Sequence, residues 1–75
     1  MYDEYKMRCQ NLLSLCDDEN KIKRLNLIAE MLEIPNCFLN ISISSALNVF
    51  IDLGYTKEEA RQEYLKATEF KANYD

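Results

Sequence analysis

The chain has 75 residues, of which 48% are hydrophobic and 29% charged, with one glycine and one proline. This composition is too apolar and too poor in helix breakers for a disordered tail, so residues 1–75 are expected to fold as a single helical domain. A chain of this length buries only about 60% of the surface that its unfolded form exposes. The core is therefore thin, with room to be completed by a partner or by a second copy in a homodimer.

The formal net charge of the chain is −4. Negative charge opposes non-specific attraction to nucleic acid and to anionic lipid, and it favours a partner protein with a basic surface. No apolar run is long enough to span a membrane, and the first four residues, Met1-Tyr2-Asp3-Glu4, are acidic where a secretory signal would be basic and then apolar. The sequence therefore predicts a cytoplasmic protein.

Residues suited to catalysis or to metal binding are scarce. Histidine is absent, and a single glycine cannot build a phosphate-binding loop or an oxyanion hole. The acidic run at 17–19 lacks the spaced carboxylates and central glycine of a calcium loop. Cys9, Cys16 and Cys37 follow no metal-ligand spacing, and we interpret them as small buried hydrophobic residues. We expect no enzyme activity, no cofactor and no metal.

Two helices are expected in the first half of the chain. The first runs from about Tyr2 to Cys16, and the second from about Glu19 to Glu33, with the acidic run at 17–19 as its N-cap and first turn. Pro35 is expected to end the second helix because it disfavours a helical conformation in the residue before it. The second helix is apolar on most sides, which is typical of a central bundle helix. The first helix has one apolar stripe, formed by Tyr5, Cys9, Leu12, Leu13 and Cys16.

The segment from Ile34 to Ile51 contains no charged residue. Its second half has a helical pattern, with Ser44, Asn48 and Asp52 on one face and Ile43, Leu47, Phe50 and Ile51 on another. Its first half is ambiguous, because apolar and polar residues alternate from Leu39 to Ser44 with the period of a strand. A helix beginning at about Asn36 or Asn40 is favoured, and a short strand is the alternative.

A last helix is expected to follow Gly54, which suits the C′ position that ends a helix. Thr56 and Glu59 have the spacing of a capping box, with Tyr55 and Ala60 as a hydrophobic staple. The helix is expected to reach about Ala72, with Ala60, Tyr64 and Ala67 inward, Leu65 and Phe70 on its flanks, and a charged, solvated outer face. The short connections favour antiparallel neighbours, so the predicted fold class is all-α, a compact bundle of about four short helices.

One local pattern resembles a protein-binding family. The segment from Leu47 to Ala67, with Leu53-Gly54-Tyr55 followed by Ala60, resembles the helix-loop-helix of ubiquitin-associated-like domains. Such domains bind protein partners through this loop and a following helix. The resemblance implies that Leu53, Gly54 and Tyr55 contact a partner.

Two other patterns resemble DNA-binding families. The segment from Gly54 to Arg61 is similar to the turn of ribbon-helix-helix repressors, whose paired strand would be Leu39 to Ser44, and Leu27 to Leu39 is similar to a helix-turn-helix. Neither DNA-contacting segment would carry a lysine or an arginine to meet phosphate. A dimeric DNA-binding regulator is therefore the alternative function, and binding of nucleic acid is disfavoured.

The favoured function is protein binding. The charge-free segment is either a core helix or, at Phe38, Leu39 and Ile41, an exposed patch for a partner or a twin chain. A short acidic chain without catalytic groups suits an inhibitor, anti-defence or adaptor protein of a phage or mobile element, which acts by occupying a partner's surface. A structural subunit that completes a larger assembly is a third possibility.

Overall fold

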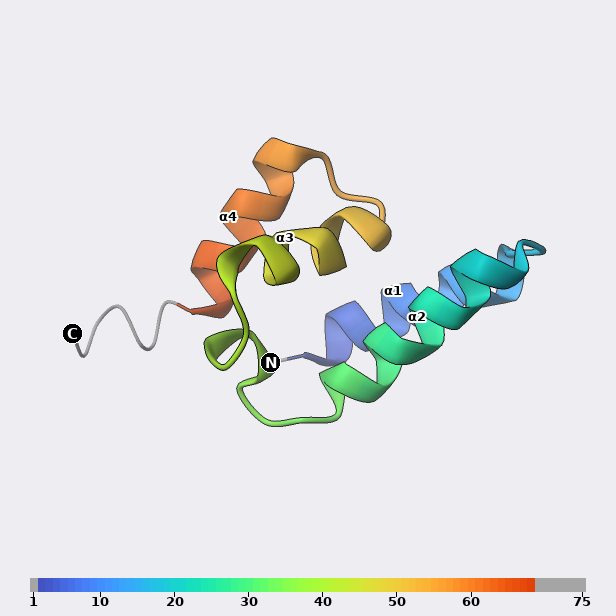
Figure 1. Cartoon of the computed structure of the whole chain (residues 1–75), viewed down its shortest axis with the longest axis horizontal. Helices are drawn as coiled ribbons and strands as arrows, with labels where there is room; N and C mark the ends of the chain where they lie inside the picture. The colour runs from blue at the N-terminus through green and yellow to red at the C-terminus, as the bar shows by residue number, and fades with distance from the viewer. Residues whose placement is uncertain (1, 69–75) are drawn as a thin grey trace. The chain divides into compact units, whose positions relative to one another are not determined.

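The structure, a computed structural model, describes residues 2–68. These residues form four α-helices and one 3-10 turn without any strand (Figure 1), so the predicted all-α class is confirmed. The chain divides between Pro35 and Asn36 into two compact units. The first unit holds α1 (Asp3–Leu15) and α2 (Glu19–Leu32), and the second holds η1 (Cys37–Leu39), α3 (Ile43–Asp52) and α4 (Lys57–Ala67). That residues 1–75 act as one domain stays a prediction.

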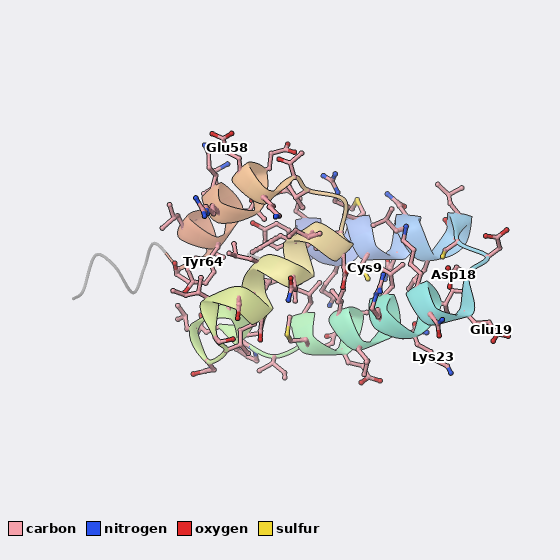
Figure 2. The ribbon with its side chains drawn as sticks, turned by 45° about the horizontal axis from the view of Figure 1, so that its top comes forward. Cys9, Asp18, Glu19, Lys23, Glu58 and Tyr64 are labelled. Atoms are coloured by element: carbon pink, nitrogen blue, oxygen red, sulfur yellow. The ribbon has the colours of Figure 1, made fainter. Side chains whose placement is uncertain are left out.

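The first unit is an antiparallel pair of helices, in which α1 packs against α2. The Lys6 ammonium near the start of α1 lies 2.8 Å from a carboxylate oxygen of Glu33, just after α2. Cys9 faces α2 (Figure 2), where its buried thiol donates a hydrogen bond to the carbonyl oxygen of Leu25, 3.1 Å away. Both contacts join α1 to α2 or to the residue that follows it. Its buried side chains include Tyr5, Cys9, Leu25, Ile28 and Leu32.

The turn between α1 and α2 confirms the predicted helix start. Asp18 is the N-cap of α2, and its carboxylate accepts hydrogen bonds from the backbone N–H groups of Asn20 and Lys21 at 2.9 and 3.2 Å. At the other end, the N–H of Ile34 donates to the carbonyl of Met31, a tightened last turn. Pro35 follows and cannot continue the helix. The sequence therefore placed both ends of α2 to within a residue.

Most apolar side chains of α2 are covered at least in part, and a single stripe of them is buried. Leu27 is 64% exposed although it is apolar, and Leu25, Ile28 and Leu32 alone among the apolar residues of this helix are buried. Their spacing of three and four residues is the ordinary stripe of a helix with one packed face. Ile22, Ala29 and Met31 are half-buried, so six of the seven apolar positions of α2 are at least partly covered and Leu27 is the exception.

The segment between Asn36 and Ser42 is neither the favoured helix nor the alternative strand. Asn36 adopts a left-handed conformation with φ of 57°, and a single 3-10 turn follows it at Cys37–Leu39. Ser42 is extended, and its hydroxyl accepts a hydrogen bond from the N–H of Ser45 as the N-cap of α3. The prediction that the helix begins at Asn36 or Asn40 was wrong because this cap starts it at Ile43.

Aromatic rings fill the centre of the second unit. Phe50 of α3 stacks on Phe38 of η1, with ring centroids 4.8 Å apart, and meets Tyr55 edge-on at 5.8 Å. The helices α3 and α4 pack against each other. The buried side chains of this unit include Cys37, Phe38, Ala46, Val49, Phe50, Leu53, Ala60 and Ala67.

The connection between α3 and α4 follows the sequence signals closely. Gly54 has φ of 101° and donates its N–H to the carbonyl of Ile51, and the N–H of Tyr55 donates to that of Phe50, which is a Schellman motif. Thr56 and Glu59 form the predicted capping box. The helix α4 ends at Ala67, and its expected continuation to Ala72, with Phe70 on its flank, lies outside the described residues.

Candidate functional site

The residues predicted to contact a partner do not form one exposed patch. Phe38 and Leu53 have no exposed side-chain surface, Leu39, Ile41 and Tyr55 are half-buried, and Gly54 is exposed. Phe38 is buried because its ring stacks on Phe50, which makes it a core residue. The expectation of an exposed patch that includes Phe38 was wrong. Whether Leu39, Ile41 or the loop at 53–55 contacts a partner stays a prediction.

A different hollow lies on the surface of the second unit, between α3 and α4. It is lined by Ile43 and Leu47 of α3 and by Arg61, Tyr64 and Leu65 of α4, and its volume is about 330 Å³. We call it the α3–α4 groove. The start of α3 thus faces the second half of α4, where Tyr64 lies (Figure 2).

Helical spacing brings the five lining residues together. Ile43 and Leu47 are one turn apart on α3, as are Arg61 and Leu65 on α4, with Tyr64 beside them. Ile43 is 60% exposed and Leu65 is 65% exposed, so the walls of the groove are open to solvent.

The helical pattern places Ile43 and Leu47 on the same apolar face as Phe50. The residues of α3 that are buried are Ala46, Val49 and Phe50; Phe50 follows Ile43 two turns later on the same side of the helix, and Ile51 is 39% exposed. Because Ile43 and Phe50 share one apolar stripe, periodicity could not show that Phe50 is buried and Ile43 is exposed. One available signal for the groove was Leu65, an apolar residue among the charged positions of α4.

The groove has a locally positive character. Arg61 is the one charged residue in its lining, and among residues 2–68 its guanidinium forms no ion pair, even though Glu58 lies one turn before it. The other positive feature is the N-terminus of α3, at Ile43. Ser42 caps the N–H of Ser45, which leaves the N–H groups of Ile43 and Ser44 without an acceptor among the described residues. Uncapped N–H groups and the helix dipole both favour an anion there.

A second hollow, in the first unit, has an ion pair of the protein itself in its lining. It is lined by polar and apolar residues at the open end of the helix pair, and its volume is about 250 Å³. Lys6 and Glu33 bridge it at 2.8 Å, and this contact raises the pKa of the Lys6 ammonium. Because the charges satisfy each other, this hollow offers a ligand less than the α3–α4 groove does. Its lining is Tyr2, Asp3, Lys6, Leu32, Glu33, Ile34 and Pro35.

The cysteines are free thiols, and two of them are core residues, as the sequence predicted. Burial raises the pKa of the Cys9 thiol, against a smaller opposite effect from the backbone at Ala29. Burial also raises the pKa of the Cys37 thiol. A raised pKa keeps a thiol protonated and makes it a weaker nucleophile and metal ligand near neutral pH. Cys16 is half-buried.

Within residues 2–68 there is no group of three or more acidic, histidine or cysteine side chains placed to hold a metal ion. None of the helices described has the length and apolar composition needed to cross a bilayer. No protein-family model matches the chain, and the comparisons with curated proteins and with solved structures found no match.

Proposed function

We propose that this chain is a small protein-binding regulator or inhibitor that acts by occupying a surface of a partner protein. The single observation that supports this function best is the α3–α4 groove, whose apolar walls at Ile43 and Leu65 are more than half exposed. Isolated exposed leucines are common on soluble proteins, but a hollow lined by four apolar side chains is the kind of surface that protein interfaces cover.

The role is that of a binding module in the cytoplasm, without chemistry of its own. The buried thiols and the absence of histidine leave few groups suited to nucleophilic or acid–base work near neutral pH. The net charge of −4 also opposes non-specific binding to nucleic acid. A partner with a basic surface stays part of the proposal, and the exposed acidic run at 17–19 is the segment that would face it, although the Asp18 carboxylate already caps α2.

The test is binding to an identified partner. A protein captured by the tagged wild-type chain is identified and purified, and its affinity for the free chain is measured by calorimetry. We expect a one-to-one complex of the separately folded proteins. A chain that captures no protein but binds a defined DNA sequence at physiological salt would overturn the proposal in favour of a DNA-binding regulator.

The groove is tested by a matched pair of substitutions in the same assay. Leu65→Asp places a charge in the groove, and Leu27→Asp makes the same change on α2 at a leucine of nearly equal exposure, 64% against 65%. We expect Leu65→Asp to weaken binding by about tenfold or more and Leu27→Asp to leave it within about twofold. Equal effects of the two changes would move the binding surface away from the groove.

A further inference from the structure

We infer that the α3–α4 groove receives a short amphipathic segment of a partner protein that carries a carboxylate beside its apolar anchor residues. This inference rests on the proposed function and specifies the partner chemistry of the same site.

The apolar lining defines the anchor. Ile43 and Leu47 form one wall, and Tyr64 and Leu65 form the other. A volume of about 330 Å³ is near the lower end for ligand sites, which run from about 300 to 1,000 Å³. It therefore suits one or two apolar side chains. Two such side chains one turn apart on a helix would follow the groove between α3 and α4.

The positive groups define the charge of the partner. Arg61 forms no ion pair among the described residues, and no lysine and no acidic side chain share the lining with it. A carboxylate near Arg61 would gain a charge-assisted hydrogen bond in a site that becomes drier once it is covered. The helix α3 begins at Ile43, which lines the same groove, and the free N–H groups of this helix end favour the same sign of charge. A partner segment carrying lysine or arginine would be repelled at both places.

The openness of the groove favours a protein over a small amphiphile. A small-molecule site buries about 70–90% of its ligand inside a cleft. Here both walls carry residues that are more than half exposed, Ile43 at 60% and Leu65 at 65%. A fatty acid lying in such a groove would leave much of its chain in water. A peptide supported by the rest of a partner's surface would cover the walls instead.

The experiment uses the full chain and a displayed library of random peptides about 16 residues long, enough for roughly four helical turns. Selected peptides are made synthetically, and their affinities are measured by fluorescence anisotropy. We expect a consensus of two apolar residues one turn apart with an aspartate or glutamate nearby. Amide-resonance shifts should map binding to residues 43–47 and 61–65.

Variants of Arg61 test the predicted charge. Arg61→Glu should lower the affinity for the selected peptides by about tenfold. A peptide whose carboxylate residue is replaced by lysine should bind the Arg61→Glu variant more tightly than it binds the wild-type chain. Lys57→Glu makes the same charge change on α4 outside the groove lining and should alter binding by less than about threefold. Circular dichroism checks that each variant keeps its helices; both substituted side chains are exposed, so neither change disturbs the core.

Four results would overturn the inference. Selected peptides with a basic consensus, or peptides that bind Leu65→Asp as tightly as wild type, would show that the groove does not take an acidic anchor. A selection that enriches no peptide would also overturn the inference. Saturable binding of sodium dodecanoate at the groove without any selected peptide would assign the site to an amphiphilic anion. The proposed function is judged separately, because a purified partner that binds elsewhere on the chain would leave that function standing.

Discussion

The ring of Phe38 in η1 stacks on the ring of Phe50 in α3, with centroids 4.8 Å apart and planes inclined by 26°. Neither ring is exposed. The stack holds η1 against α3. The residues between them, 40–42, bend the chain and end at Ser42, the N-cap of α3. A residue that looked like a partner contact in the sequence is thus a central packing residue of the second unit.

Replacing Phe38 with alanine should therefore destabilise the protein strongly. The lost transfer free energy and the cavity left against Phe50 together predict a loss of about 3–5 kcal/mol in the free energy of unfolding, measured by urea denaturation. Phe38→Leu keeps most of the volume and should cost much less. If Phe38→Ala unfolded at the same urea concentration as wild type, the ring would not be part of the core.

The sequence predicted where helices begin and end better than it predicted which side chains are buried. Caps and turns are local, so Asp18, Gly54 and Thr56 could be assigned their roles from a few neighbouring residues. Burial depends on contacts between distant residues. In α3, Ile43 and Phe50 share one apolar stripe, so the pattern could not show that Phe50 is buried and Ile43 is exposed.

The groove was missed for the same reason. Its lining combines Ile43 and Leu47 with residues of α4 that lie fourteen or more positions later in the sequence. Only the packing of the two helices brings Arg61 beside those apolar side chains. From the sequence, Leu65 could be placed on the flank of the last helix and Arg61 on its charged outer face. Which residues of α3 lie opposite them could not be read from the sequence.

The two residues with positive φ within residues 2–68 should respond to substitution by different amounts. Gly54 has φ of 101°, so Gly54→Ala places a Cβ in a conformation disfavoured for other residues and should cost about 1–2 kcal/mol. Asn36 has φ of 57°, which glycine also adopts readily, so Asn36→Gly should change stability by only a few tenths of a kcal/mol. Urea midpoints of the two variants check this. A Gly54→Ala variant as stable as wild type would contradict the Schellman end of α3.

The N-cap of α2 predicts a smaller and more local effect. Asp18→Ala removes the acceptor for two backbone N–H groups and should cost about 1 kcal/mol, while Asp18→Asn should keep most of the cap. Asp17→Ala is the matched control, because it removes the same charge one residue earlier without removing the N-cap. Equal losses for the two alanine variants would point to the charge of the turn and not to the cap.

The cysteines should react with thiol reagents in two classes. Cys9 and Cys37 are at most 2% exposed, whereas Cys16 is half-buried at the end of α1. Native protein treated with iodoacetamide at neutral pH should be modified first at Cys16, and Cys9 and Cys37 should react more than about tenfold more slowly because they need local unfolding. Mass spectrometry of peptides gives the order. Early modification of Cys9 would show that the α1–α2 pair opens readily.

The same buried thiols predict a loss of stability at alkaline pH. Burial raises the pKa of Cys9 and of Cys37 above the ordinary value of 9.0, so on raising the pH the unfolded chain loses these protons before the folded one does. Their stabilising contribution is complete below the unfolded pKa and is lost as the pH rises through the folded pKa. Urea midpoints should therefore fall from about pH 8 upward. The raised pKa of Lys6 acts in the same direction, but only from about pH 10.5.

Cysteine variants separate the thiol effect from other alkaline titrations. Cys9→Ala lowers stability at neutral pH, because it removes the hydrogen bond to the Leu25 carbonyl, yet its urea midpoint should fall less steeply with pH than that of wild type. Cys16→Ala removes a half-buried thiol and should keep the wild-type slope. If Cys9→Ala and wild type lost stability in parallel between about pH 8 and 9.5, the buried thiol of Cys9 would not be the titrating group. The steepness of the curve, and not its height at neutral pH, therefore reports on the environment of this thiol.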